Sequence, residues 1–209
     1  MIVAFTHFGT DDRFVKIMLA SIRRVMPHAL TLQMTDEHTA ALADVDEVRR
    51  LPYDGEFLMT YRLRHMAELS YGEYLFLDTD VVVLQDVSGI FDLPFDVALP
   101  RCERPVLAPD GTDISQTMPY NFGVLFSRSP LFWEQAHEVC KTFTPDVQKC
   151  WGDQLAVKLV VDTDEFDVLE LPGDTFNFTP DNAQEDLGPR AIVHYKGKRK
   201  HWMLERFPV

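Results

Sequence analysis

The chain has 209 residues, of which 25% are charged and 46% are apolar, and its formal net charge is −13. These proportions are typical of a globular protein, so they exclude a disordered chain, and the apolar runs are too short to cross a bilayer. The acidic balance also argues against binding of nucleic acid through a general electrostatic field, which needs clustered Lys and Arg.

The apolar residues recur with periods that alternate between strand and helix. In chain order they predict a strand over residues 2–6, a helix over 14–25, a strand over 30–34, a short helix over 36–43, a strand over 47–51, a helix over 60–69, a strand over 74–83, a turn over 89–94, strands over 97–99 and 121–127, and a helix over 130–143. Residues 101–119, rich in Pro, Gly, Asp and Thr, are predicted to form a loop over a ligand site. This alternation favours an α/β fold of one domain, residues 1–209, with a mostly parallel central sheet flanked by helices.

Two carboxylates interrupt the apolar run 74–83, which is typical of a buried parallel strand. Asp78 and Asp80 lie on the same face of a strand, and burying them is costly unless a cation meets them. If the chain turns there, both can reach one hard ion of the magnesium or manganese type; the alternative is an acidic loop at the strand edge. The same Asp-Thr-Asp tripeptide recurs at 162–164 inside an acidic segment, where we expect a solvated turn.

Two other segments are candidates for binding an anionic ligand. Ligands of open α/β sheets lie at the carboxyl ends of the strands. The turn after the first strand, with Thr6 and His7, lies at such an end and can offer backbone groups and a ring to a nucleotide, although His7 can equally be an ordinary loop histidine. A local cationic patch that suits a small anion, or is simply solvated, consists of Lys196, Lys198, Arg199 and Lys200.

Several sequence blocks, in order along the chain, resemble the family 8 glycosyltransferases, which include bacterial lipopolysaccharide galactosyltransferases and glycogenin. The blocks are Thr-Tyr-Arg-Leu at 60–63, the Asp-Thr-Asp strand at 74–83, Tyr-Asn-Phe-Gly-Val at 120–124, Trp-Gly-Asp-Gln-Leu at 151–155, Phe-Asn-Phe at 176–178 and His-Tyr-Lys-Gly-Lys-Arg-Lys-His-Trp at 194–202. The last departs from the family pattern because His201 replaces a proline. The resemblance implies a GT-A fold and transfer of a sugar, with retention, from a UDP-sugar.

The resemblance also implies roles for individual residues. Asp78, Asp80 and His194 would bind Mn²⁺, with Mg²⁺ as the alternative, because Mn²⁺ accepts imidazole more readily. Lys200 and the backbone near Gly197 would neutralise the departing nucleoside diphosphate. The remaining positions implied to bind the donor or act in catalysis are Thr6, His7, Arg62 with Arg64 as its local competitor, Asp78, Asn121, which would hydrogen-bond sugar hydroxyls, Asp153, which would orient the donor sugar, and Gln154 near the anomeric carbon. Gly123 would allow close approach of the backbone.

The mechanism and rival functions can be weighed from these residues. Gln154 is a poor nucleophile, which favours a front-face reaction over double displacement. An inverting transferase would need a carboxylate as general base. A sugar-1-phosphate nucleotidylyltransferase would need a Gly-rich basic loop after the first strand, whereas residues 6–11 hold one glycine and neither Lys nor Arg. A sugar-nucleotide-binding protein without transfer activity would use most of the same residues.

The sequence also suggests partners and a compartment. We expect a UDP-galactose or UDP-glucose donor and a carbohydrate, lipid-linked glycan or protein acceptor. Residues 1–80 are expected to form the nucleotide-binding half and 81–209 the acceptor and catalytic half. Acceptor choice is assigned to residues 101–119 and 179–190. Residues 1–6 lack the features of a signal peptide, and the three cysteines form no Cys-x-x-Cys pair. We therefore expect a cytoplasmic protein with no integral membrane segment, and nothing in the sequence indicates an oligomeric state.

Overall fold

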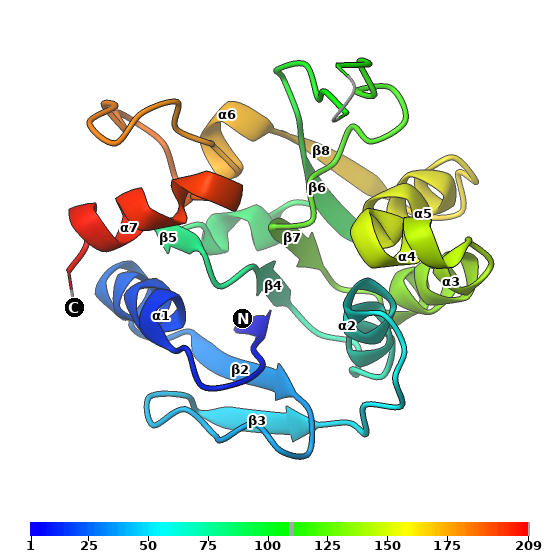
Figure 1. Ribbon diagram of the computed structural model, residues 1–209, viewed down its shortest axis with the longest axis horizontal. Helices are drawn as coiled ribbons and strands as arrows, with labels where there is room; N and C mark the ends of the chain where they lie inside the picture. The colour runs from blue at the N-terminus through cyan, green and yellow to red at the C-terminus, as the bar shows by residue number, and fades with distance from the viewer. Residues whose placement is uncertain (109–110, 209) are drawn as a thin grey trace.

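A central sheet of seven strands organises the computed structural model, which describes residues 1–108 and 111–208 (Figure 1). The strand order is β3-β2-β1-β4-β7-β6-β8. The strands are β1 Ile2–Thr6, β2 Leu30–Thr35, β3 Glu47–Arg50, β4 Tyr74–Leu77, β6 Val97–Arg101, β7 Val124–Ser127 and β8 Val168–Pro172. β1, β2, β3 and β4 pair in parallel, as do β6 and β8, whereas β7 lies antiparallel between β4 and β6. The prediction of a mostly parallel sheet is confirmed.

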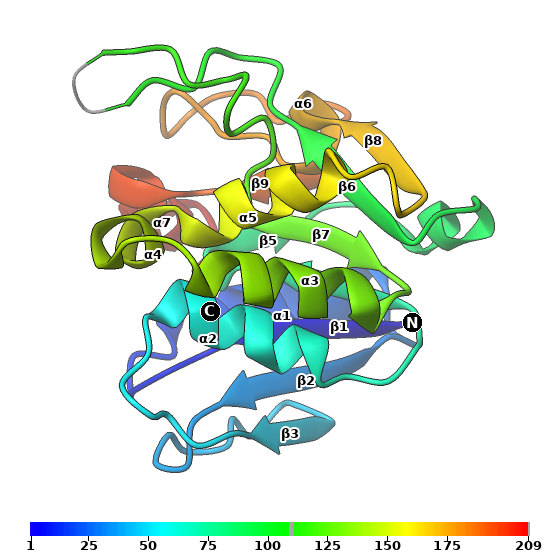
Figure 2. The ribbon, with the colours of Figure 1, turned by 90° about the vertical axis from the view of Figure 1, so that its right-hand side faces the viewer.

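Helices cover both faces of this sheet (Figures 1 and 2). The helices are α1 Arg13–Val25, α2 Leu58–Ala67, α3 Pro130–Lys141, α4 Pro145–Cys150, α5 Gly152–Val161, α6 Gly173–Phe176 and α7 Lys200–Arg206, with short 3₁₀ helices η1 Ser88–Asp92 and η2 Gly197–Arg199. Because side chains alternate along a strand, Val3 and Phe5 pack in the core under α1, while Ala4 packs in the core under α2, α3 and α5. No helix among the described residues combines the length and apolarity needed to span a bilayer.

The predicted strand 74–83 is in fact two strands in two sheets. β4 ends at Leu77, and β5 Val81–Val83 pairs antiparallel with β9 Ile192–His194 in a separate two-stranded sheet. Aspartate disfavours a strand, so the chain turns at Asp78–Asp80 and the apolar residues 81–83 are buried elsewhere. The turn that the metal hypothesis required is present.

The predicted short helix over 36–43 is wrong, because these residues form turns and irregular chain. The Asp36 carboxylate accepts hydrogen bonds from the N–H groups of His38 and Thr39 at 3.0 and 2.6 Å. Such side-chain bonds compete with the helical bonds of the backbone. Arg50 then fixes the segment by donating to the Asp36 and Thr39 carbonyls.

We expect a fully buried histidine on α2 to make stability fall in acid. His65 is 0% exposed and packs edge-on to Tyr61, and burial lowers its pKa to about 4. A histidine in the unfolded chain titrates near 6.5, so the unfolded state takes up the proton first and stability is lost as pH falls from about 6.5 to about 4. Below about pH 4 the loss is complete and amounts to about 3 kcal/mol, by the usual conversion of a pKa difference into free energy.

Urea unfolding at pH 7 and pH 4.5 measures this loss. His65→Leu should remove about 2–3 kcal/mol of the difference between the two pH values. The exposed His28→Leu is the control and should behave like the parent. An unchanged pH dependence in His65→Leu would contradict the prediction.

Candidate functional site

Two strand ends bring three metal-ligating side chains together. Asp78 and Asp80 occupy the turn after β4, and His194 ends β9. The register of the small sheet places His194 opposite Val81, and the Tyr195 N–H donates to the Asp80 carbonyl at 2.9 Å. Backbone pairing, rather than side-chain contacts alone, therefore fixes the distance between the acidic turn and the histidine.

Each of Asp78, Asp80 and His194 offers one ligand atom, and these atoms lie within 4.8 Å of one another. His194 Nε2 lies 3.2 Å from Asp80 Oδ1 and 3.6 Å from Asp78 Oδ2. His194 is 2% exposed and Asp80 5% exposed. Two carboxylates and an imidazole are a suitable donor set for a divalent ion of the manganese or magnesium type, so the residues fit the metal that the sequence predicted.

A second layer of amides holds the His194 ring. Its Nδ1 lies 3.0 Å from Asn177 Oδ1, so a proton on Nδ1 leaves Nε2 free to act as a ligand. Asn177 Nδ2 in turn donates to Asn121 Oδ1 at 3.2 Å, and Asn121 Nδ2 donates to Gln154 Oε1 at 3.3 Å. A chain of amides therefore links the metal-ligating histidine to Gln154.

Gly123 makes room for that ring. A Cβ built at this position would lie 2.1 Å from His194 Cε1 and 2.2 Å from its Nδ1. The close approach to the backbone that was expected at Gly123 is thus made by the His194 ring. The predicted strand 121–127 is correspondingly shorter, because β7 begins only at Val124, after the Gly123 N–H has bonded to the Asn121 side chain.

We predict that Gly123→Ala displaces His194. The variant should lose about 1–3 kcal/mol of stability from overpacking and about 10–100-fold in Mn²⁺ affinity, measured by urea unfolding and by calorimetric titration. Gly89→Ala is the control, because its Cβ meets only Asp92 Oδ2 at 3.9 Å. Parental Mn²⁺ affinity in Gly123→Ala would show that the ring does not need this space.

A basic side chain already meets the acidic turn. Lys200 begins α7 and places Nζ 3.2 Å from Asp80 Oδ2. Burial alone would raise the pKa of Asp80, but the hydrogen bond from His194 and the charge of Lys200 lower it. Gly197, at φ +65°, supplies the left-handed residue before η2 that favours glycine.

Arg62 joins the acidic turn to the start of α5. Its Nη1 lies 2.9 Å from Asp78 Oδ1, its Nη2 pairs with Asp153 Oδ2, and its guanidinium lies over the Phe122 ring at 3.8 Å. Asp153 is 0% exposed and also accepts the Gln154 N–H at 2.7 Å. Burial alone would lower the pKa of Arg62, but Asp153 and Asp78 together raise it. Burial raises the pKa of Asp153, against the effect of Arg62.

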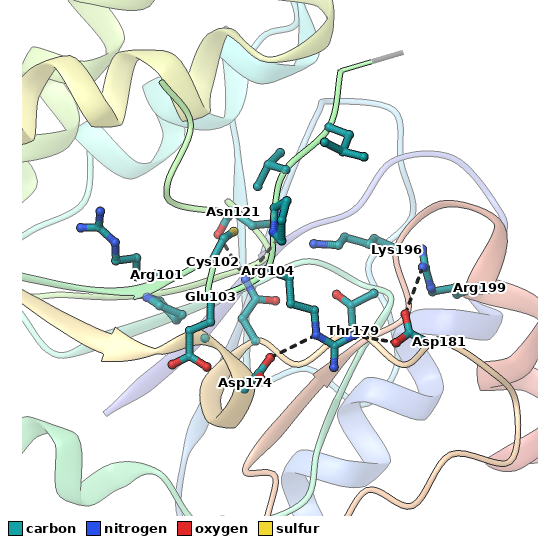
Figure 3. A pocket seen from close by; sticks show the side chains of 16 residues that line it. Arg101, Cys102, Glu103, Arg104, Asn121, Asp174, Thr179, Asp181, Lys196 and Arg199 are labelled. Carbon is teal, nitrogen blue, oxygen red and sulfur yellow. Dashed lines mark hydrogen bonds and ion pairs between the residues drawn. The ribbon is translucent and has the colours of Figure 1, made fainter. Parts of the chain in front are cut away.

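Two cavities flank this cluster. The smaller, about 240 Å³, is lined by Thr6, Phe8, Leu58, Met59, Arg62, Asp78, Thr79, Asp80 and Lys200. The larger, about 460 Å³, lies between residues 100–107 and the segment from Gly173 to Asp181, with Asn121, Asn177, Lys196 and Arg199 completing its lining (Figure 3). The predicted loop 101–119 therefore contributes a wall of a cavity, although residues 109–110 lie outside the described part of the chain.

Comparisons with known proteins bear on the fold. No family profile and no curated protein matches the sequence. The solved structure of the glycosyltransferase GlyE of Streptococcus pneumoniae TIGR4 matches all of this chain, with 15% identity and a TM-score of 0.68. The galactosyltransferase LgtC, in complex with donor and acceptor sugar analogs, also matches all of it, with 14% identity and a TM-score of 0.64. A glycosyltransferase that acts in glycosylation of the PBCV-1 major capsid matches 99%, with 13% identity and a TM-score of 0.63.

The chain has the GT-A fold. It spans 60% of the GlyE chain and 97% of the LgtC and PBCV-1 chains. The GT-A fold predicted from the sequence motifs is confirmed.

Most of the site residues predicted from the sequence meet around the acidic turn of this GT-A fold. Thr6, Arg62, Asp78 and Lys200 line the smaller cavity, and Arg62 rather than Arg64 faces it, because Arg64 pairs with Glu56 and Asp54.

Several predicted residues are not among the described lining of either cavity: His7, Gly123, Asp153, Gln154, His194 and Gly197. His7 is buried and its Nε2 lies 3.2 Å from the Asp11 carbonyl, and Gly197 is exposed. Phe8, which was not among the predicted site residues, lines the smaller cavity in place of its neighbour His7. The signal in the sequence that could have identified Phe8 is its position as an aromatic residue in the turn after the first strand.

Proposed function

We propose that the chain is a metal-dependent, retaining glycosyltransferase that moves a hexose, galactose or glucose, from a UDP-sugar to an acceptor hydroxyl. The observation that carries this proposal is the convergence of Asp78, Asp80 and His194 at the carboxyl end of β4 in a GT-A fold. Ligands of open α/β sheets bind at this edge. The galactosyltransferase LgtC, among the structures that share the fold, supports the choice of donor.

Asp78, Asp80 and His194 would hold the metal, which when bound supplies positive charge to the donor diphosphate. Lys200, beside Asp80 in the smaller cavity, would add its ammonium to the same developing negative charge. Arg62 would hold the acidic turn and Asp153 in place. Residues 1–80 would form the nucleotide-binding half and 81–209 the acceptor and catalytic half.

The surroundings of Asp153 support a front-face reaction. One of its oxygens accepts the Gln154 N–H, the other meets Arg62, and the side chain is fully buried, so neither oxygen is free as a nucleophile. In the front-face reaction the bond from the anomeric carbon to the diphosphate oxygen breaks as the acceptor oxygen bonds to the same face, and the acceptor proton passes to the departing phosphate oxygen. Asn121 and Gln154, held together by their hydrogen bond, would position the donor sugar.

A panel of sugar nucleotides tests the proposal. UDP-galactose, UDP-glucose, UDP-N-acetylglucosamine, GDP-mannose and ADP-glucose are each incubated with Mn²⁺, Mg²⁺ or EDTA, with and without simple glycoside acceptors. We expect release of UDP that needs the metal, and retained configuration at the anomeric carbon by NMR. Tight binding of UDP-sugars without release from any of them would replace the proposal with that of a sugar-nucleotide-binding protein.

A cytoplasmic location is part of the proposal.

A further inference from the structure

The larger cavity is distinct from the smaller cavity, which lies beside the metal-ligating side chains. Two residues that line the larger cavity nevertheless belong to the amide chain that holds one of the metal ligands. Asn121 and Asn177 line the larger cavity and belong to the amide chain that holds His194 and Gln154. Asp78, Asp80 and Lys200 line only the smaller one. If the donor diphosphate binds at the acidic turn, the larger cavity lies on the side from which a second substrate reaches the donor sugar. Its volume of about 460 Å³ is within the range of small-molecule sites.

Most charged side chains at the rim of this cavity are paired, and the exposed Glu103 is an acidic lining residue outside these pairs (Figure 3). Arg104 lies 2.8 Å from Asp181 and 3.6 Å from Asp174, and Arg199 lies 3.8 Å from Asp181. The carboxylates of the two aspartates are therefore already engaged by the two arginines. Arg101, at the opposite end, pairs with Glu170.

Lys196 differs from these rim residues. It is partly buried, and its side chain extends toward Asn121, away from the Arg199–Asp181 pair (Figure 3). Within residues 1–108 and 111–208, Lys196 makes no ion pair within 4.0 Å, and the Asp78 and Asp80 carboxylates act on its ammonium only from a greater distance. An ammonium taken out of water without a counterion is costly, and a protein with 33 acidic and 20 basic residues has ample carboxylates to pair with it. The unpaired charge therefore indicates that a ligand supplies the anion.

We propose that this cavity binds an acceptor sugar that carries a phosphate or carboxylate group, and that Lys196 recognises that group. This inference rests on the proposed function and names the substrate class of the second site. Lys196 lines the larger cavity and not the smaller one, which assigns its charge to the acceptor rather than to the donor diphosphate. Asn121 also lines this cavity, so an acceptor bound there would lie next to a residue that would position the donor sugar.

Matched acceptor pairs test the inference. The parent, loaded with Mn²⁺ and its active UDP-sugar, is assayed with methyl β-glucoside against methyl β-glucuronide, and with glucose against glucose 6-phosphate. We expect kcat/KM to favour the anionic member about 10–100-fold, the worth of a hydrogen bond to a charged group. Lys196→Met should bring that ratio close to one, whereas Lys196→Arg and the exposed Lys198→Met should keep it. A ratio close to one in the parent, or a ratio that survives in Lys196→Met, would overturn the inference.

Two further arms separate the sources of the anion and the failure of the underlying function. UDP-glucuronate against UDP-glucose, without acceptor, tests a donor carboxylate; a preference there that Lys196→Met removes would reassign the lysine to the donor and overturn the acceptor assignment. Binding of glucose 6-phosphate and of glucose to the protein with Mn²⁺ and UDP is measured by calorimetry. If no sugar nucleotide is turned over, the proposed transferase fails, while selective binding of glucose 6-phosphate that needs Lys196 would still support the anion site.

Discussion

Asp80→Asn is expected to lose about a thousandfold in metal-dependent release of UDP, the scale of removing a principal charge-stabilising group. The substitution keeps the size of the side chain but removes one of the two negative charges of the metal-ligating cluster. It also removes the carboxylate that Lys200 contacts and the nearer of the two carboxylates that His194 contacts. Turnover in a sugar-nucleotide assay and Mn²⁺ affinity by calorimetry should fall together.

The second Asp-Thr-Asp tripeptide provides the control. Asp164 is exposed and has a φ of 56°, a conformation that Asn also tolerates. Asp164→Asn changes the same net charge in the same local sequence, so it should retain parental turnover and metal affinity. Parental turnover in Asp80→Asn would refute the role of the acidic turn, whatever the control does.

Arg62→Met is expected to destabilise the protein by about 3–5 kcal/mol, because it leaves a fully buried carboxylate without its partner. Asp153 is 0% exposed and has Arg62 as its ion-pair partner among the described residues. Removing the carboxylate as well, in Arg62→Met with Asp153→Leu, should restore most of the lost stability. Both variants should lack transferase activity, since the double variant regains the fold without the site.

Urea unfolding of the two single variants and the double variant measures this coupling. Arg49→Met is the control: Arg49 pairs with Glu68 at 3.2 Å, both side chains are about a third or more exposed, and its loss should cost less than about 1 kcal/mol. If Arg62→Met costs no more than Arg49→Met, the buried pair does not stabilise the fold. Strictly additive effects of the Arg62 and Asp153 substitutions would lead to the same conclusion.

The acidic turn could be predicted from the sequence because its signal is local. Two carboxylates in an apolar run require a cation or a turn, and the structure supplies a turn with His194 and Lys200 beside it. The antiparallel direction of β7 could not be predicted, because alternation of side chains is the same in either direction. β5 and β9, with three residues each, are too short to show a period and exist through their mutual pairing.

Other elements were not predicted for separate physical reasons. α5 contains the apolar run from Leu155 to Val161 with a single lysine, so its buried and exposed faces are hard to tell apart by pattern. β8 contains Glu170 and ends at Pro172, which suits an edge strand but weakens the strand pattern. Lys196 belonged to a basic run whose members look alike in sequence, and only the fold separates it, lining the larger cavity, from the exposed Lys198.

The pairing of β5 with β9 also sets the order in which the site can be assembled during translation. Asp78 and Asp80 leave the ribosome long before His194 and Lys200, because β9, the strand that brings His194 to them, lies far downstream of β4 in the chain. Synthesis runs from the N-terminus, so β1, β2 and β4 are complete while the acidic turn still has no histidine. A nascent chain of this protein therefore carries the carboxylates of the metal cluster without its imidazole ligand. Competence to bind the metal through all three side chains therefore arises only after β9 has been made and has paired with β5.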